Sequence, residues 1–312
     1  MSAWVRSTSL GVVLIVGAVF IGSVSHPFHF DDEHSITANP NIRPPVNWVR
    51  IATDPGVFSR NPGSGMYRPV VMVSYVVNFV LGGTDSPGWH AFNLLIHLSC
   101  TVLVGLLAWH LTRDRQAQWV AALLFGLHPV VAEPVNYVSS RSESLSAFFS
   151  LNCLVLYVRA NGSPVHYWGS VASFAAALLA KSIGLMAPLG LALYDLSGGR
   201  ALWRRSKYYA AFVLVGTVYV LAVRQALQTA LVEHPVRSLW IQLCTQVKVL
   251  VYYLKLLLVP TGQSVEHQIA LAGGLGDGAV LAAVARLCVP SRSHAVAPRF
   301  CCSSACQSEA RR

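Results

Sequence analysis

The chain has 312 residues, of which 54% are hydrophobic and only 12% are charged, and its mean hydropathy is +0.51. An ordinary soluble domain carries about 25% charged residues, so this composition excludes a disordered chain and an ordinary soluble enzyme. The formal net charge of +10 does not indicate a nucleic-acid partner, because the basic residues form no stripe with interleaved aromatic residues. We therefore expect a polytopic membrane protein that binds the lipid bilayer and no nucleic acid.

Apolar runs predict the membrane helices. The first run, at 9–25, is expected to be a retained transmembrane helix and not a cleaved signal peptide, because its apolar stretch extends to Val24 and many spans follow it. Lys248 and Lys255 share one face of the helix predicted at 239–259, so an interfacial position competes with a crossing one. The other expected spans lie at 89–112, 117–133, 143–159, 165–181, 183–197 and 208–225, with a weak apolar stretch at 269–289.

The positions of Arg and Lys orient these spans. If 67–83 also crossed, the basic loops around Arg113 and around 200–207 would lie outside, against the positive-inside rule. We therefore expect 67–83 to lie in the interface or to re-enter, with 26–66 as an outer loop. This topology predicts a multi-pass protein of a bacterial inner membrane or an ER-type membrane, with its active site on the outer or luminal face.

The first outer loop carries three adjacent carboxylates, Asp31, Asp32 and Glu33. Such carboxylates repel one another. One of them can serve as a general base on an acceptor hydroxyl, and others can hold a divalent cation against a phosphate leaving group. Asp31 and Asp32 are the candidate catalytic residues and the candidate metal ligands, and Glu33 is a further candidate. A solvated acidic loop is the alternative interpretation.

A second polar motif follows the span at 117–133. Pro129 and Pro134 interrupt a helix at the membrane surface and orient His128 and Glu133. Glu133 is therefore a third candidate catalytic residue, and His128 and Glu143 are further candidates. Arg141 can form a bidentate contact with a phosphate; in the alternative it pairs with Glu133 or Glu143.

Other polar side chains are expected on the same face. Arg68 and Lys181 either contact a lipid phosphate or extend to the lipid headgroups as simple anchors. Glu266 and His267 join them if 239–259 does not cross the membrane.

Together these residues resemble the membrane half of the transmembrane and tetratricopeptide-repeat family, over roughly residues 8–285. The resemblance implies a GT-C-like fold related to protein O-mannosyltransferases: an all-α bundle with interfacial helices in its first outer loop. It also implies sugar transfer from a polyprenyl- or dolichyl-phosphate donor to a hydroxyl acceptor on a protein or glycan. The resemblance is carried, in chain order, by Asp31-Asp32, Tyr67-Arg68-Pro69-Val70, Ser74, Asn78, Trp89-His90, Asn93, His97, His128-Pro129, Glu133, Ser140-Arg141-Ser142-Glu143, Ala180-Lys181, Pro188, Tyr194-Asp195, Tyr253-Leu254-Lys255, Pro260 and Glu266-His267.

The resemblance implies roles for the matched residues. Asp32 would be the base, and Asp31 would assist it or bind a metal. The lipid phosphate would be bound by Arg68, Arg141 and Lys181. Ser182 departs from the family, which usually has Glu after the lysine. A transporter of a lipid-linked or anionic substrate and a non-catalytic membrane scaffold remain alternatives, and the cofactor stays undetermined, with a divalent cation as one candidate.

The composition changes near residue 286, so we expect a membrane domain at 1–285 and an atypical Cys, Ser and Arg tail at 286–312. No helical repeat of about 34 residues follows the membrane part, which indicates a truncated or frameshifted product; a genuine tail is the alternative. The spacing of Cys301, Cys302 and Cys306 does not fit a zinc site. The earlier cysteines lie in apolar runs, where cysteine behaves as a small hydrophobic residue.

Overall fold

The computed structural model describes residues 3–61, 65–160, 162–233, 238–264, 269–274 and 276–288. These residues form helices joined by loops, with no strand among them, which confirms the predicted all-α class. The chain divides into two compact units, Met1–Val236 with Val259–Glu266 and Arg237–Leu258 with His267–Arg312. Glu266, His267 and residues 289–312, for which we made predictions, lie outside the described residues.

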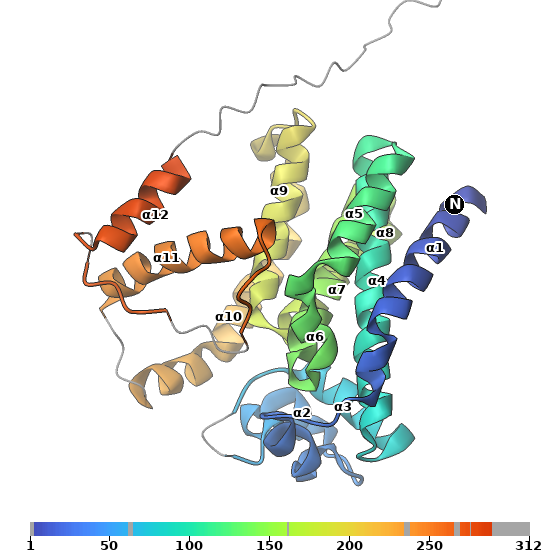
Figure 1. The fold of residues 1–312 in the computed structure, drawn as a ribbon, viewed down its shortest axis with the longest axis vertical. Helices are drawn as coiled ribbons and strands as arrows, with labels where there is room; N and C mark the ends of the chain where they lie inside the picture. Colours follow the sequence, from blue (N-terminus) through green and yellow to red (C-terminus); the bar gives the residue numbers. More distant parts are fainter. Residues whose placement is uncertain are drawn as a thin grey trace, which may run out of the picture. The chain divides into compact units, whose positions relative to one another are not determined.

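The first unit contains ten α-helices within its described residues (Figure 1). They are α1 Ala3–Phe20, α2 Trp48–Thr53, α3 Pro69–Gly82, α4 Ser86–Thr112, α5 Arg115–Leu127, α6 Ala132–Asn136, α7 Arg141–Ala160, α8 Pro164–Ala180, α9 Ala187–Ser197 and α10 Ser206–Glu233. Short single-turn helices connect them, namely η1 Ile21–Ser25, η2 Glu33–Thr37, η3 Pro40–Ile42, η4 Pro55–Phe58, η6 Pro129–Val131, η7 Val138–Ser140, η8 Ser182–Met186 and η9 Leu202–Arg205.

Local sequence signals set several helix ends. Pro69 and Pro164 are the first residues of α3 and α8, where a missing N–H costs nothing. Asp114 caps α5, since its Oδ1 accepts a hydrogen bond of 2.9 Å from the Gln116 N–H. The predicted break at Pro129 is also present, because Arg115–Leu127 and Pro129–Asn136 meet at 52°.

Three helices in the described part of the chain are long and apolar enough to cross a membrane: Ser86–Thr112, Ser206–Arg224 and Leu239–Leu258. The number rises to four candidate spans if the bent pair Arg115–Leu127 and Pro129–Asn136 is counted as one span. Leu239–Leu258, for which an interfacial position was one alternative, thus has the length and composition of a span. Pro69–Gly82 is among the shorter apolar helices, together with Leu10–Ser25 and Ser182–Ser197, which the sequence predicted as spans.

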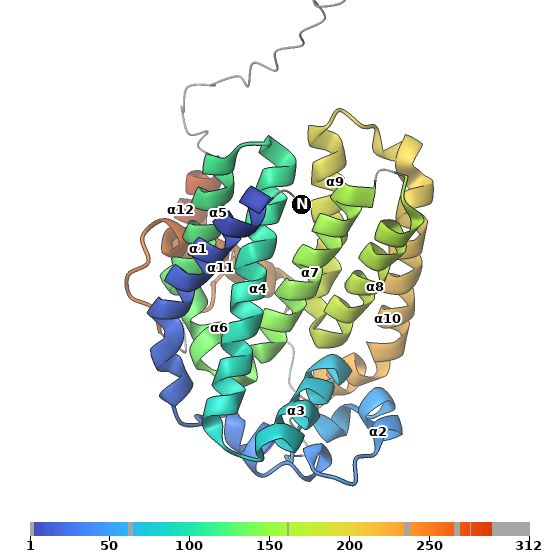
Figure 2. The same cartoon turned by 90° about the vertical axis from the view of Figure 1, so that its right-hand side faces the viewer.

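Three buried clusters lie in the described part of the first unit, and the largest joins the loop region around Ile42 and Phe58 to α3, α4 and α7. Val16, Leu94 and Ala122 belong to the cluster between α1, α4 and α5. Phe174 and Phe212 belong to the cluster formed by α7, α8, α9 and α10, where α7 and α8 run side by side (Figure 2). Membrane helices associate through side-chain packing of this kind.

The two ends of this unit carry different connections (Figures 1 and 2). Residues 26–61, which include α2, lie at one end together with 65–66 and α3, and we call it the loop end. The turns from α4 to α5, from α7 to α8 and from α9 to α10 lie at the opposite end, which we call the basic end because they carry Arg113, Arg200 and Arg205. The sequence-predicted outer loop and basic loops are therefore on opposite ends of the bundle.

The second unit contains α11, Leu239–Leu258, and α12, Gly278–Cys288. Cys244, Ala272 and Val280 form its small core. The Lys248 ammonium donates hydrogen bonds to the Ala270 carbonyl at 2.9 Å and to Asp277 Oδ2 at 3.4 Å. Lys248 is thus engaged within its own unit.

Candidate functional site at the loop end

The acidic loop is fixed to the bundle through Asp32. Asp32 is fully buried, and its Oδ1 accepts hydrogen bonds from the Ser139 N–H at 2.8 Å and from the Ser139 hydroxyl at 2.6 Å. Its Oδ2 accepts a bond of 3.0 Å from the His29 N–H. Both carboxylate oxygens are therefore used inside the protein, and this geometry does not fit the role of base that the resemblance implied for Asp32.

Asp31 lies in the opposite environment. Its side chain is 66% exposed, and its Oδ1 lies 3.3 Å from His34 Nε2. The Asp31 N–H donates to the Tyr137 hydroxyl at 3.1 Å, which anchors the backbone and leaves the carboxylate facing outward. Burial raises the pKa of Tyr137 to about 12, so this phenol stays protonated at neutral pH.

The same geometry tests whether Asp31 and Asp32 can form the predicted metal site. The two aspartate side chains are engaged by different partners, Asp31 by His34 and Asp32 by Ser139. No group of three or more His, Cys, Asp or Glu side chains placed to hold a metal ion occurs in the described part of the chain. Asp31 and Asp32 therefore do not form the divalent-cation site considered from the sequence, and we derive no step through a metal.

The role predicted for Arg141, a contact with a phosphate or an ion pair with Glu133 or Glu143, requires a correction. Its guanidinium is fully buried and donates to Asn93 Oδ1 at 2.7 Å, to Asn78 Oδ1 at 2.6 Å and to the Trp89 carbonyl at 3.0 Å. It also lies 4.8 Å from the centroid of the Phe92 ring. Arg141 thus neither reaches a lipid phosphate nor pairs with Glu133 or Glu143; it joins the start of α7 to α3 and α4.

The other two cations predicted to bind a phosphate are accessible, and contacts with Ser142 and Glu143 connect them to each other. Arg68 Nη1 donates to the Ser142 hydroxyl at 3.0 Å, and that hydroxyl donates to Glu143 Oε2 at 2.7 Å. The Lys181 ammonium forms an ion pair with Glu143 Oε1, with the two side chains 30% and 41% exposed. These contacting side chains include two cations and one carboxylate, so the group has a net charge of +1. We refer to Arg68, Ser142, Glu143 and Lys181 as the cation relay.

The remaining candidates have modest contacts. Glu133 is exposed, and its Oε1 accepts a bond of 3.3 Å from the Ser140 hydroxyl. His128 Nδ1 accepts a bond of 3.2 Å from the Val130 N–H and so caps the turn at Pro129. Glu33 is exposed at the start of η2.

One short segment, 137–143, contacts the acidic loop and both accessible cations. Tyr137 and Ser139 hold the acidic loop, and Ser142 and Glu143 hold Arg68 and Lys181. Sequence reasoning missed Tyr137 and Ser139, although both lie inside the motif region that it singled out. The signal that could have found them is the run of small hydroxyl residues between Glu133 and Glu143, since such side chains commonly bond to backbone and carboxylate groups.

The fold and this site define an integral membrane protein of the all-α class, with an exposed carboxylate and a cation relay at one end of a helical bundle. The chain is similar to protein O-mannosyl-transferases, which confirms the family resemblance. Protein O-mannosyl-transferase TMTC2 of Mus musculus is 28% identical over 175 residues, 54% of this chain and 20% of that protein. Protein O-mannosyl-transferase Tmtc1 of Drosophila melanogaster is 29% identical over 194 residues, 59% of this chain and 22% of that protein.

A third relative, Protein O-mannosyl-transferase F38B6.6 of Caenorhabditis elegans, is 30% identical over 147 residues, 45% of this chain and 21% of that protein. The matched part therefore spans about a fifth of the length of these relatives. No family model and no solved structure matches the chain.

Proposed function

We propose that this chain provides the membrane part of a glycosyltransferase that moves a sugar from a lipid-phosphate carrier to a hydroxyl group of a protein. The names of its relatives favour mannose as the sugar and protein as the acceptor. The observation that carries the proposal is the segment 137–143, which holds an exposed carboxylate through Tyr137 and two accessible cations through Ser142 and Glu143.

In the proposed reaction Asp31 is the general base. It accepts the proton of the acceptor hydroxyl while the hydroxyl oxygen attacks the anomeric carbon of the sugar. The bond between that carbon and the carrier phosphate breaks, and the phosphate leaves with its bonding electron pair. Arg68 and Lys181 stabilise the negative charge that develops on the phosphate. Asp32 is a positioning residue, which holds the loop against Ser139.

The experiment compares two isosteric variants. The purified chain, reconstituted in liposomes with a mannosyl-phosphate polyprenol and a Ser- and Thr-rich peptide, is expected to transfer the sugar. Asp31→Asn is expected to lower turnover by about 10²- to 10⁴-fold, the usual contribution of a general base, without lowering thermal stability. Asp32→Asn places an amide N–H₂ against the His29 or Ser139 N–H and is expected to lower the melting temperature.

Donor binding is measured separately. Arg68→Gln and Lys181→Gln are expected to weaken binding of the mannosyl-phosphate polyprenol, because each removes one charge from the cation relay. If Asp31→Asn turns over like the parent, the base assignment is wrong. If the chain neither binds the donor nor transfers the sugar, the scaffold alternative replaces the enzyme.

A further inference from the structure

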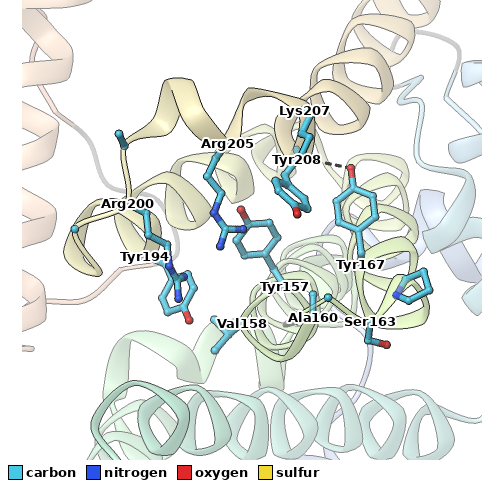
Figure 3. Close-up of a pocket in the computed structure, with 14 residues that line it drawn as sticks. Tyr157, Val158, Ala160, Ser163, Tyr167, Tyr194, Arg200, Arg205, Lys207 and Tyr208 are labelled. Atoms are coloured by element: carbon cyan, nitrogen blue, oxygen red, sulfur yellow. Dashed lines mark hydrogen bonds between the residues drawn. The ribbon is translucent and has the colours of Figure 1, made fainter.

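The basic end of the first unit holds a pocket that the proposed function does not use. It has a volume of about 820 Å³ and lies between the last turn of α7, the first turn of α8, the end of α9 and the start of α10 (Figure 3). Its walls are rich in tyrosine and in basic residues. The side chains that matter here are Tyr157, Tyr167, Tyr194, Arg200, Arg205 and Lys207.

The charge balance of this pocket favours an anion. Arg200, Arg205 and Lys207 contribute three cations, and none of the described residues that line the pocket is Asp or Glu. One carboxylate, Asp195, lies behind the wall and is fully buried. Its Oδ1 lies 3.2 Å from Arg200 Nη1 and 3.8 Å from Arg205 Nε. The group as a whole therefore keeps a net charge of +2.

Asp195 also fixes the direction of the two arginines. Its Oδ2 accepts hydrogen bonds from the hydroxyls of Tyr157 at 2.7 Å and Tyr209 at 2.9 Å, so the carboxylate cannot turn away. The Arg200 guanidinium lies 5.1 Å from the centroid of the Tyr194 ring. A hydrogen bond to Tyr194 and the neighbouring Asp195 raise the pKa of Arg200, which therefore keeps its charge at neutral pH.

The two guanidinium groups retain capacity for a ligand. Arg200 is 37% exposed and Arg205 is 30% exposed, although both touch the same buried carboxylate. Figure 3 shows the Arg205 guanidinium beside the ring of Tyr157 and the Arg200 side chain over the ring of Tyr194. A planar guanidinium held by one carboxylate still has N–H groups for a phosphate, and its preorganisation reduces the entropy cost of binding.

An apolar cavity lies next to this pocket on the same helices. It has a volume of about 380 Å³ and is lined by side chains of α8, α9 and α10, among them Phe174, Phe212 and Leu221. Gly216 lies in its wall. The ring of Tyr167, from the basic pocket, packs against the ring of Phe212 with centroids 6.2 Å apart, so the two cavities share a wall. Leu221 is 55% exposed.

We propose that the two cavities together bind one anionic phospholipid, with its headgroup phosphate between Arg200, Arg205 and Lys207 and an acyl chain along α10. A free phosphate would use only the polar pocket, whereas a lipid fills both cavities. Tyrosine and basic side chains at helix ends are typical of the membrane interface, which is where a headgroup lies. This inference rests on the basic end alone and does not depend on the proposed sugar transfer at the loop end.

The test uses the purified full chain in detergent and native mass spectrometry. The probes are dioleoyl phosphatidic acid, dioleoylglycerol, which lacks the phosphate, and inorganic phosphate. Phosphatidic acid is expected to bind most tightly. Lys207→Gln is expected to weaken its binding about fivefold, because one basic side chain near a membrane surface contributes about 1 kcal/mol. Arg159→Gln is the matched control, since Arg159 is exposed near the end of α7 and does not line the pocket.

A second pair of variants tests the acyl-chain cavity. A Cβ at Gly216 would meet Leu185 Cδ2 at 3.7 Å, an ordinary contact, so Gly216→Ala is expected to bind the lipid like the parent. Gly216→Leu fills the cavity. It is expected to weaken the binding of phosphatidic acid at least threefold and to leave the binding of inorganic phosphate unchanged. Equal effects of Lys207→Gln and Arg159→Gln, or equal affinity for inorganic phosphate and phosphatidic acid, would overturn the proposal.

Discussion

At the scale of single residues, Arg141 connects several polar residues that are far apart in the sequence. Asn78 comes from α3, Asn93 comes from α4, and both amide oxygens accept from its guanidinium. The Trp89 carbonyl accepts from the same group. A buried cation is costly unless its donors are satisfied, and here neutral acceptors from two helices satisfy them. These residues of the family-like pattern therefore form one structural contact network.

We expect Arg141→Lys to destabilise the fold although it keeps the positive charge. A lysine ammonium has no planar fork and cannot reach Asn78, Asn93 and Trp89 at once. Each buried acceptor left without a donor costs about 1–3 kcal/mol. The measurement is the midpoint of thermal unfolding in detergent. Arg159→Lys, at an exposed position of the same helix, is the control, and equal midpoints for the two variants would contradict the network role.

The sequence predicted which polar residues gather at the loop end, but not what each one does there. Asp31 and Asp32 are neighbours with the same chemistry, but Asp32 alone of the two bonds to Ser139, 107 residues further on in the sequence. Arg141 likewise contacts Asn78 across 63 positions of sequence. Such contacts depend on how helices meet, which local patterns do not encode.

At the scale of elements, the predicted helices agree closely with the observed ones because apolar length and proline positions determine them locally. The predicted span at 89–112 is α4, Ser86–Thr112, and the expected break at Pro129 is a bend of 52°. The predicted span at 183–197 differs. Its first four residues lie in η8, Ser182–Met186, and only Ala187–Ser197 is α-helical.

The close approach of α1, α4 and α5 depends on Gly126. A Cβ at this position would lie 2.7 Å from Val16 Cγ2 and 3.0 Å from Thr101 Cγ2. Small residues of this kind let membrane helices pack tightly. The His97 ring nitrogen Nε2 also lies 3.0 Å from the Gly126 carbonyl oxygen, so the contact joins α4 and α5 as well.

We expect Gly126→Ala to destabilise the first unit by about 1–3 kcal/mol, the usual cost of overpacking a filled core. The control is Gly88→Ala, because no heavy atom lies within 4 Å of a Cβ at Gly88 and the position is helical. Unfolding of both variants in detergent is the measurement. The packing argument fails if Gly126→Ala is as stable as Gly88→Ala.

At the scale of the first unit as a whole, the two ends separate two kinds of chemistry. The loop end holds the exposed carboxylate of Asp31 and the cation relay, and the basic end holds the tyrosine- and arginine-lined pocket. The turns at the basic end carry most of the positive charge that oriented the sequence-predicted spans. The positive-inside rule predicts that the basic end faces the cytoplasm, and we propose that sugar transfer takes place on the other side of the membrane.

The orientation is tested by cysteine labelling. Glu33 and Arg159 are both exposed, one at the loop end and one near the basic end, so Glu33→Cys and Arg159→Cys can each report one side. The native Cys100, Cys153 and Cys244 are buried and give little background, and the cysteines from 288 onward are replaced by serine. In sealed vesicles a membrane-impermeant maleimide is expected to label only one of the two variants from outside, and the other only after permeabilisation. In right-side-out vesicles the variant labelled first is expected to be Glu33→Cys. Labelling of both from the same side would mean that the loop end and the basic end do not face opposite sides of the membrane, and the charge-based topology would be wrong.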